Sequence, residues 1–143
     1  MIVCNIYTKV PAMGISKGLV KEIAHMVLMD LGFSVSEVAF HFVGTKEMRS
    51  LNRIHRGLDR PTDVLSFAAS EGVVFSSDVK DVGDIFLCVP YIKNQAKDVG
   101  VSYKEECSRM LIHGLLHALG YDHGNKKDAK TMFGLQERFL TMI

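Results

Sequence analysis

The spacing of apolar and polar residues divides the chain into helical and extended segments. From Lys17 to Leu31, apolar residues recur every three or four positions between a capping serine, Ser16, and Gly32, which predicts an amphipathic helix. The same criteria predict further helices, and short alternating or apolar runs predict strands. The predicted helices cover residues 17–31, 46–56, 90–99, 103–119 and 128–143, and the predicted strands cover residues 2–7, 38–43, 62–69 and 85–89.

The order of these elements predicts an α+β fold. We expect one domain, residues 1–143, in which a small mixed β-sheet packs with about five helices. Thr45 is expected to cap the second helix. Residues 62–69 are expected at a sheet edge or along a cleft, because the preceding Pro61 has no N–H to donate to a neighbouring strand. The loosest segment is expected at residues 70–82, where Gly, Ser and Asp gather.

Composition narrows the possible function classes. With 48% hydrophobic and 23% charged residues, the chain has the make-up of a folded domain rather than that of a disordered segment or a coiled coil. The formal net charge is +1, so any contact with nucleic acid must rest on a local basic patch. No apolar run approaches the roughly 20 residues of a membrane helix, and the N-terminus lacks a secretion-signal pattern, so no membrane partner is expected.

The cysteines indicate a reducing compartment. Cys4, Cys88 and Cys107 lie far apart among apolar neighbours, and none belongs to a CxxC pair. An odd number of cysteines without a disulfide pattern is typical of reduced core thiols. We therefore expect a cytoplasmic protein.

The strongest chemical signal is a cluster of histidines near the C-terminal end of the chain. His113 and His117 are four residues apart on a predicted helix, so their side chains share one face. Gly120 can end that helix, and His123 can then approach the same point from another direction. Three nitrogen ligands leave one position of a tetrahedral zinc site open, as in catalytic zinc sites. A water bound there can reach a pKa of about 7.

The residue after the first histidine argues against a peptidase. Metallopeptidases of the HExxH type carry a glutamate there as general base and proton donor, whereas this chain has Gly114. Amide hydrolysis needs protonation of a poor leaving amine. Phosphodiester cleavage depends more on stabilising the charge around phosphorus, which a metal ion and an arginine can do.

Arginines occur at helical spacing in the middle of the chain. Arg49, Arg53 and Arg56 are predicted to form a stripe on the second helix, followed by Arg60. The stripe fits a ridge that contacts phosphates, and it fits a plain solvated helix face equally well. The segment from Asn52 to Phe67 also contains many small hydrogen-bonding side chains, Asp63 and Ser66 among them.

These motifs resemble those of a known family. Residues 113–123, which read as HGxLHxxGYDH, together with residues 51–67 and the short segment Gly83–Asp84–Ile85, resemble the YbeY family of metal-dependent endoribonucleases of bacterial rRNA maturation. Order, spacing and total length agree over nearly the whole chain. One departure is Ala68, where relatives often have proline, and it touches no expected ligand.

The resemblance implies a fold, a cofactor and a substrate. It implies a zincin-like α+β fold and one Zn²⁺ per chain held by the three matching histidines, His113, His117 and His123. Arg56 matches an arginine thought important for activity. The implied substrate is single-stranded RNA, notably the 3′ end of 16S rRNA, with a role in ribosome quality control. A monomer is expected.

Other roles stay open at this point. The candidates for orienting ligands or substrate are Asn52, Asp63, Ser66, Asp84 and Asp122, although capping or turn formation explains the aspartates equally well. One alternative function is a non-catalytic ribosome-assembly module in which zinc only staples the helix end. Another is a metallopeptidase that recruits its acid–base residue from outside the histidine motif.

Overall fold

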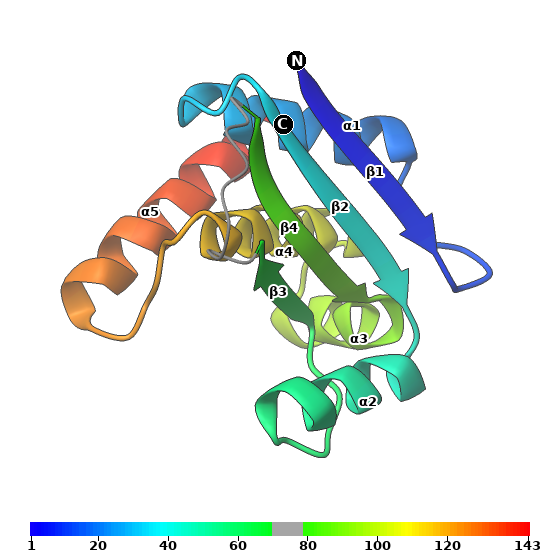
Figure 1. Ribbon diagram of the computed structural model, residues 1–143. Coiled ribbons are helices and arrows are strands. Elements are labelled where there is room, and N and C mark those ends of the chain that lie inside the picture. The colour runs from blue at the N-terminus through cyan, green and yellow to red at the C-terminus, as the bar shows by residue number, and fades with distance from the viewer. Residues whose placement is uncertain (70–78) are drawn as a thin grey trace.

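The computed structural model describes residues 1–69 and 79–143, which form an α+β fold with one sheet (Figure 1). The four strands are β1 (Ile2–Thr8), β2 (Ser36–Val43), β3 (Val64–Ala68) and β4 (Lys80–Cys88). The five helices in these two ranges are α1 (Lys17–Asp30), α2 (Thr45–Arg56), α3 (Val89–Val99), α4 (Tyr103–Ala118) and α5 (Lys126–Thr141). The expected mixed sheet and number of helices are therefore confirmed.

The sheet is parallel except at one edge. Its strand order is β1-β2-β4-β3, and β3 runs antiparallel to β4, with Ser66 opposite Ile85. The prediction that residues 62–69 contain an edge strand is confirmed, because β3 has a single neighbouring strand, β4, among the described residues. Pro61 lies just before this strand, where its missing N–H leaves no ladder bond unmade.

Helix α4 lies at the centre of the fold. It packs against β3, β4, α1, α3 and α5 (Figure 1). Leu111, Ile112, Leu115 and Leu116 on α4 are fully buried in the main hydrophobic cluster, which also includes Ile85. Burial on several sides fixes the axis of α4, and its C-terminal turns lie beside the edge strand β3. Of the helices in the described ranges, none is long and apolar enough to cross a bilayer.

Helix α2 lies at the C-terminal ends of β2 and β4 and packs on a second, smaller hydrophobic cluster (Figure 1). Met48 of α2 is fully buried with Val43, Leu65 and Cys88, which come from β2, β3 and the end of β4. This packing fixes the N-terminal half of α2 on the sheet, and the contacts of His55 with Phe67 and of Arg56 with Ser66 hold its C-terminal end close to β3. The backbone positions of Arg49, Arg53 and Arg56 are therefore fixed relative to the sheet.

The helix ends agree only partly with expectation. Ser16 and Ser102 cap α1 and α4 as predicted, each accepting a backbone N–H at 3.1 Å. The prediction that Thr45 caps α2 is wrong: the cap is Gly44 and Thr45 is already helical, because β2 stays paired through Val43 and leaves a single residue for the turn. Helix α5 begins at Lys126, two residues earlier than predicted.

The segment expected to be loosest is partly a strand. Residues 80–82 belong to β4, so the prediction is wrong for them, and residues 70–78 lie outside the described residues. The pairing of β2 with β4 shifts register between Glu37 and Val38, and Gly83 has a positive φ of 108°. Both features disturb the alternation of apolar and polar residues at the start of β4, so the pattern does not predict a strand there. A Cβ on Gly83 would lie 2.1 Å from the carbonyl oxygen of Phe67, so the close approach of β3 and β4 requires glycine.

The three cysteines are free thiols. Cys88 and Cys107 are buried and Cys4 is half-buried. Burial raises the pKa values of Cys4 and Cys107 to about 11, so both stay protonated at neutral pH. Among the described residues, neither belongs to a group of side chains that could hold a metal.

Candidate metal centre and cleft

The three clustered histidines meet at one point in space. His113 and His117 project from the same face of α4, one helical turn apart. The helix ends after Ala118, and Gly120, with a φ of 100°, turns the chain so that the imidazole of His123 returns to the other two. One ring nitrogen from each histidine lies within 4.8 Å of the others. The convergence predicted from spacing is present.

The donor set suits a transition metal such as zinc. Bonds of about 2.0–2.1 Å place two nitrogens on one ion up to about 4 Å apart, so small rotations of the rings close the group around an ion. In the described part of the chain, this is the one group of three or more His, Cys, Asp or Glu side chains that could hold a metal. Three nitrogens without a fourth protein ligand leave a coordination position free for solvent or substrate.

His117 is electrostatically prepared to act as a ligand. Its pKa lies below the ordinary value, first because the ring is partly buried and then because His113 and His123 are close. Both effects disfavour the imidazolium form. His117 is therefore neutral at neutral pH, which is the form that binds a metal.

His113 is oriented by a residue that the sequence patterns did not single out. Its Nδ1 lies 2.7 Å from Oε1 of Gln136, which is buried on α5. Gln136 comes four residues after Met132 and three before Phe139, on the apolar side of its helix. A buried glutamine needs a hydrogen-bond partner. Its place among apolar residues is therefore the feature of the sequence that could have indicated a role for Gln136.

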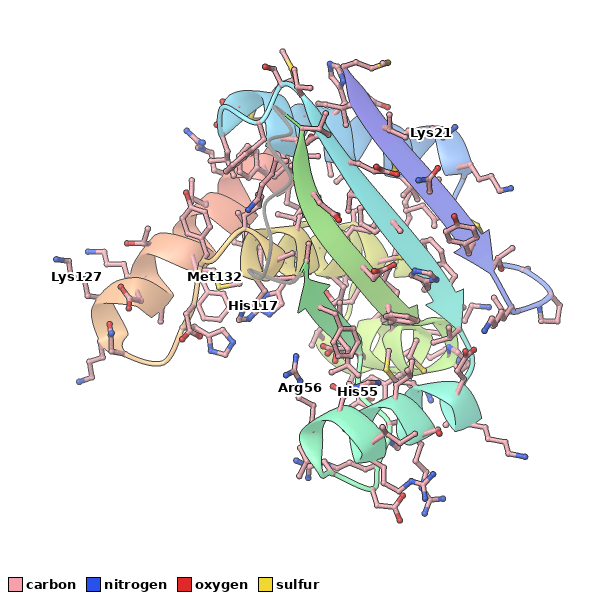
Figure 2. The ribbon with its side chains drawn as sticks, in the orientation of Figure 1. Lys21, His55, Arg56, His117, Lys127 and Met132 are labelled. Atoms are coloured by element: carbon pink, nitrogen blue, oxygen red, sulfur yellow. The ribbon has the colours of Figure 1, made fainter. Side chains whose placement is uncertain are left out.

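The histidines face a cleft of about 430 Å³. The opposite wall is the edge strand β3 and the residue before it. Arg56 extends from the end of α2 toward the side on which His117 lies (Figure 2). The lining residues other than the histidines are Arg56, Asp63, Val64, Leu65, Ser66 and Ala68. The cleft therefore joins two segments, around residues 56–68 and 113–123, that are distant in the sequence.

Gly114 brings the two walls together. A Cβ at this position would lie 2.7 Å from Cγ2 of Ile85, 3.1 Å from Cγ2 of Val64 and 3.2 Å from Oγ of Ser66. The hydroxyl of Ser66 also donates a hydrogen bond of 2.8 Å to the carbonyl oxygen of Gly114. The position that carries glutamate in HExxH peptidases thus faces the sheet here and has no room for a side chain.

Arg56 is the arginine of the predicted stripe that lines the cleft. Its Nη2 donates to the carbonyl oxygen of Ser66 at 3.1 Å, and its guanidinium lies over the ring of Phe67, 5.4 Å from the centroid. Arg49 instead forms a bidentate ion pair with Asp59, with distances of 2.9 Å from Nε to Oδ1 and 3.1 Å from Nη2 to Oδ2. Arg53 and Arg60 are exposed and are not among the lining residues in the described part of the chain.

Four of the other polar candidates, Asp63, Ser66, Asp84 and Asp122, lie in different places relative to the cleft. Asp63 and Ser66 line the cleft, and Oδ1 of Asp63 also accepts the backbone N–H of Val64 at 2.7 Å. Oδ1 of Asp122 accepts a hydrogen bond of 2.7 Å from the backbone N–H of His123, and so helps to shape the loop that carries this histidine. The structure does not bring Asp84 into the cleft: it bonds Nε2 of His41 at 2.7 Å on the opposite face of the sheet from its neighbour Ile85.

Asn52 supports the cleft without lining it. The side chain is buried, and its Nδ2 donates to the carbonyl oxygen of Arg60 at 2.8 Å. Replacing Asn52 by alanine is expected to lower the free energy of unfolding by about 1 kcal/mol, because the buried amide's hydrogen bond to the carbonyl oxygen of Arg60 is lost. Urea denaturation measures the change. The matched change Asn5→Ala removes an exposed bond to Glu37 and should cost less than about 0.5 kcal/mol; equal losses would contradict a supporting role for Asn52.

Comparisons with known proteins agree with this architecture. A family model described as Endoribonuclease YbeY matches residues 7–143. A curated protein of that name from Sulfurihydrogenibium sp. (strain YO3AOP1) is 38% identical over 130 residues, which cover 90% of this chain and 84% of the relative. Another, from Shouchella clausii (strain KSM-K16), is 40% identical over 131 residues, with coverages of 85% and 82%.

A solved structure has a similar fold. The solution structure of TM1509 from Thermotoga maritima is 29% identical and has a TM-score of 0.66, covering 98% of this chain and 87% of that one. The resemblance noted from the histidine motif and from residues 51–67 is therefore confirmed over most of the sequence and in the fold. The chain belongs to the Endoribonuclease YbeY family.

Proposed function

We propose that residues 1–143 work as one zinc-dependent domain that cleaves single-stranded RNA internally. We propose further that it acts in the cytoplasm on the 3′ end of 16S rRNA and in ribosome quality control, as a monomer. The observation that carries the proposal is the open side of the histidine group, which faces a cleft that Arg56 also lines. The names of the relatives, all endoribonucleases, support the choice of RNA.

Each cleft residue has a distinct role in this proposal. His113, His117 and His123 hold the metal, which when bound acts as a Lewis acid and lowers the pKa of a bound water. The guanidinium of Arg56 binds the scissile phosphate and stabilises the negative charge that grows on it. The carboxylate of Asp63 and the hydroxyl of Ser66 orient the substrate along the strand wall. A cleft open on one side admits an unpaired strand.

Replacing Arg56 by alanine is expected to lower kcat for RNA cleavage by about 10²–10³-fold, because one donor to the developing phosphoryl charge is lost. Zinc content should stay at the level of the unmodified protein, since Arg56 is not a ligand. Single-turnover cleavage of a labelled oligoribonucleotide measures the effect. Arg53→Ala is the matched control on the same helix and should change kcat less than about threefold. Unchanged kcat in Arg56→Ala would remove the arginine from the mechanism.

One experiment separates this function from the two alternatives. Metal-free and zinc-reloaded protein are compared for RNA cleavage and peptide hydrolysis, with the bound metal identified by elemental analysis. Recovery of RNA cleavage on reloading supports the proposal, and peptide turnover would favour a metallopeptidase. A strong loss of thermal stability without metal, together with RNA binding but no cleavage, would favour the assembly module.

The cleavage products report the nucleophile. A 2′,3′-cyclic phosphate marks attack by the neighbouring 2′-hydroxyl, and a 5′-phosphate marks attack by water. Elemental analysis also tests the choice of zinc, since histidine-rich sites accept nickel and cobalt as well.

A further inference from the structure

We propose that Gln136 is a positioning residue that holds His113 in the tautomer with its proton on Nδ1, so that Nε2 is presented to the metal. The proposal rests on the proposed function, because it assigns a role toward the metal held by the three histidines. Its evidence is the 2.7 Å contact between Nδ1 of His113 and Oε1 of Gln136.

The direction of this hydrogen bond follows from its surroundings. The other end of the amide, Nε2 of Gln136, lies 3.2 Å from Oε2 of Glu137. Hydrogen bonding to Arg109 holds the pKa of Glu137 below its usual range, so this carboxylate is ionised and can only accept. The amide nitrogen therefore faces Glu137, and the amide oxygen faces His113. An oxygen acceptor requires the proton on Nδ1 of His113.

A polar network keeps Gln136 in place. Arg109 donates to Glu137 at 3.1 Å and, through Nη1, to Glu106 at 2.6 Å. Glu106 in turn accepts from Nε2 of Gln95 at 2.7 Å. Gln136 and Glu106 are both buried, so water competes little for the bonds that these two residues make, whereas the Arg109–Glu137 pair is exposed. The network links α3, α4 and α5, and its α5 end terminates on a metal-binding side chain.

A neutral amide has a specific consequence for the metal. Histidine ligands commonly donate their other N–H to a carboxylate or a backbone carbonyl, which fixes the ring and raises its basicity. The amide of Gln136 fixes the ring but brings no negative charge to His113. It therefore orients the ligand without reducing the net positive charge of the centre, which favours attraction of a phosphate.

Two substitutions at Gln136 distinguish positioning from packing. Gln136→Leu keeps the volume and removes the acceptor, whereas Gln136→Glu keeps an acceptor and places a carboxylate beside Glu137. Positioning predicts that the leucine variant is impaired and the glutamate variant is not. A packing role predicts the opposite order, because leucine suits a buried site and a second carboxylate does not.

The test uses two measurements on the full chain. The tautomer of His113 in metal-free protein is obtained from two-bond ¹H–¹⁵N correlations, and Zn²⁺ affinity is obtained by competition with a chromogenic chelator. Gln136→Leu is expected to lose the Nδ1–H tautomer and to bind Zn²⁺ about 10–100-fold more weakly. Gln136→Glu is expected to keep both properties. Gln95→Leu, at the far end of the same network, is the matched control and should keep both.

Three results would overturn the proposal: an unchanged tautomer and affinity in Gln136→Leu, equal losses in the leucine and glutamate variants, or an equal loss in Gln95→Leu. Failure of the unmodified protein to bind Zn²⁺ would instead overturn the proposed function. The tautomer of His113 in the metal-free protein would still decide whether Gln136 orients the ring.

Discussion

Replacing His117 by alanine is expected to lower RNA cleavage by about 10³-fold or more, equivalent to about 4 kcal/mol of activation free energy. The change removes one of the three converging nitrogens and leaves two, too few to hold the metal firmly at the open side of the cleft. Zinc content after dialysis should fall in parallel. His117 is only partly buried, so the fold should survive, as circular dichroism would verify.

The control for this prediction is His25→Ala. His25 is exposed on α1 and does not belong to the histidine group, so cleavage and zinc content should stay within about twofold of the unmodified protein. Cleavage by His117→Ala at the unmodified rate, in a preparation free of other nucleases, would refute the metal-dependent mechanism.

Replacing Gly114 by alanine is expected to lower the free energy of unfolding by about 1–3 kcal/mol and to impair catalysis as well. The new methyl group would meet Ile85 and Val64 at distances below normal contact, so α4 must move away from the sheet. That movement carries His113 and His117 away from the Arg56 wall of the cleft. Chemical denaturation gives the stability, and cleavage at saturating zinc gives the catalytic effect.

Gly134→Ala is the matched control, because it makes the same change in a helix with open space around the added atom. Apart from the two neighbouring residues and the backbone of α5 itself, no atom of the described residues lies within 4 Å of a Cβ built there. The higher helix propensity of alanine should stabilise this variant by up to about 1 kcal/mol. The two changes thus have opposite predicted signs. A stabilised Gly114→Ala protein would show that the walls of the cleft are not held in close contact.

Local patterns were sufficient to predict the helices and the convergence of the histidines. The four-residue spacing of His113 and His117 and the turn at Gly120 act within one helix end, so no knowledge of the rest of the fold was needed. The caps at Ser16 and Ser102 were predictable for the same reason. Thr45 was misassigned because the length of β2, which depends on pairing with β4, decides where the next helix begins.

The opposite wall of the cleft depended on contacts between distant residues. Spacing alone could not tell which arginine enters the cleft, because the pairing of Arg49 with Asp59 depends on the path of the loop after α2. Which face of the sheet a strand residue points to also depends on the fold, and for this reason Ser66 lines the cleft whereas Asp84 points away from it, toward His41. Gln136 was missed because its partner, His113, lies 23 residues earlier on another helix.

Because the three histidines lie close together in the sequence, they can meet early in folding. All three belong to an eleven-residue segment, residues 113–123, whereas the wall formed by Arg56 and residues 63–68 lies 45 to 57 residues before His113 in the sequence. Closing so short a loop costs little entropy, but parallel strand pairing over long separations is slow. If the proposed zinc site is correct, binding of the ion is therefore expected to precede completion of the sheet, so that a chain with metal bound still lacks the Arg56 side of its cleft.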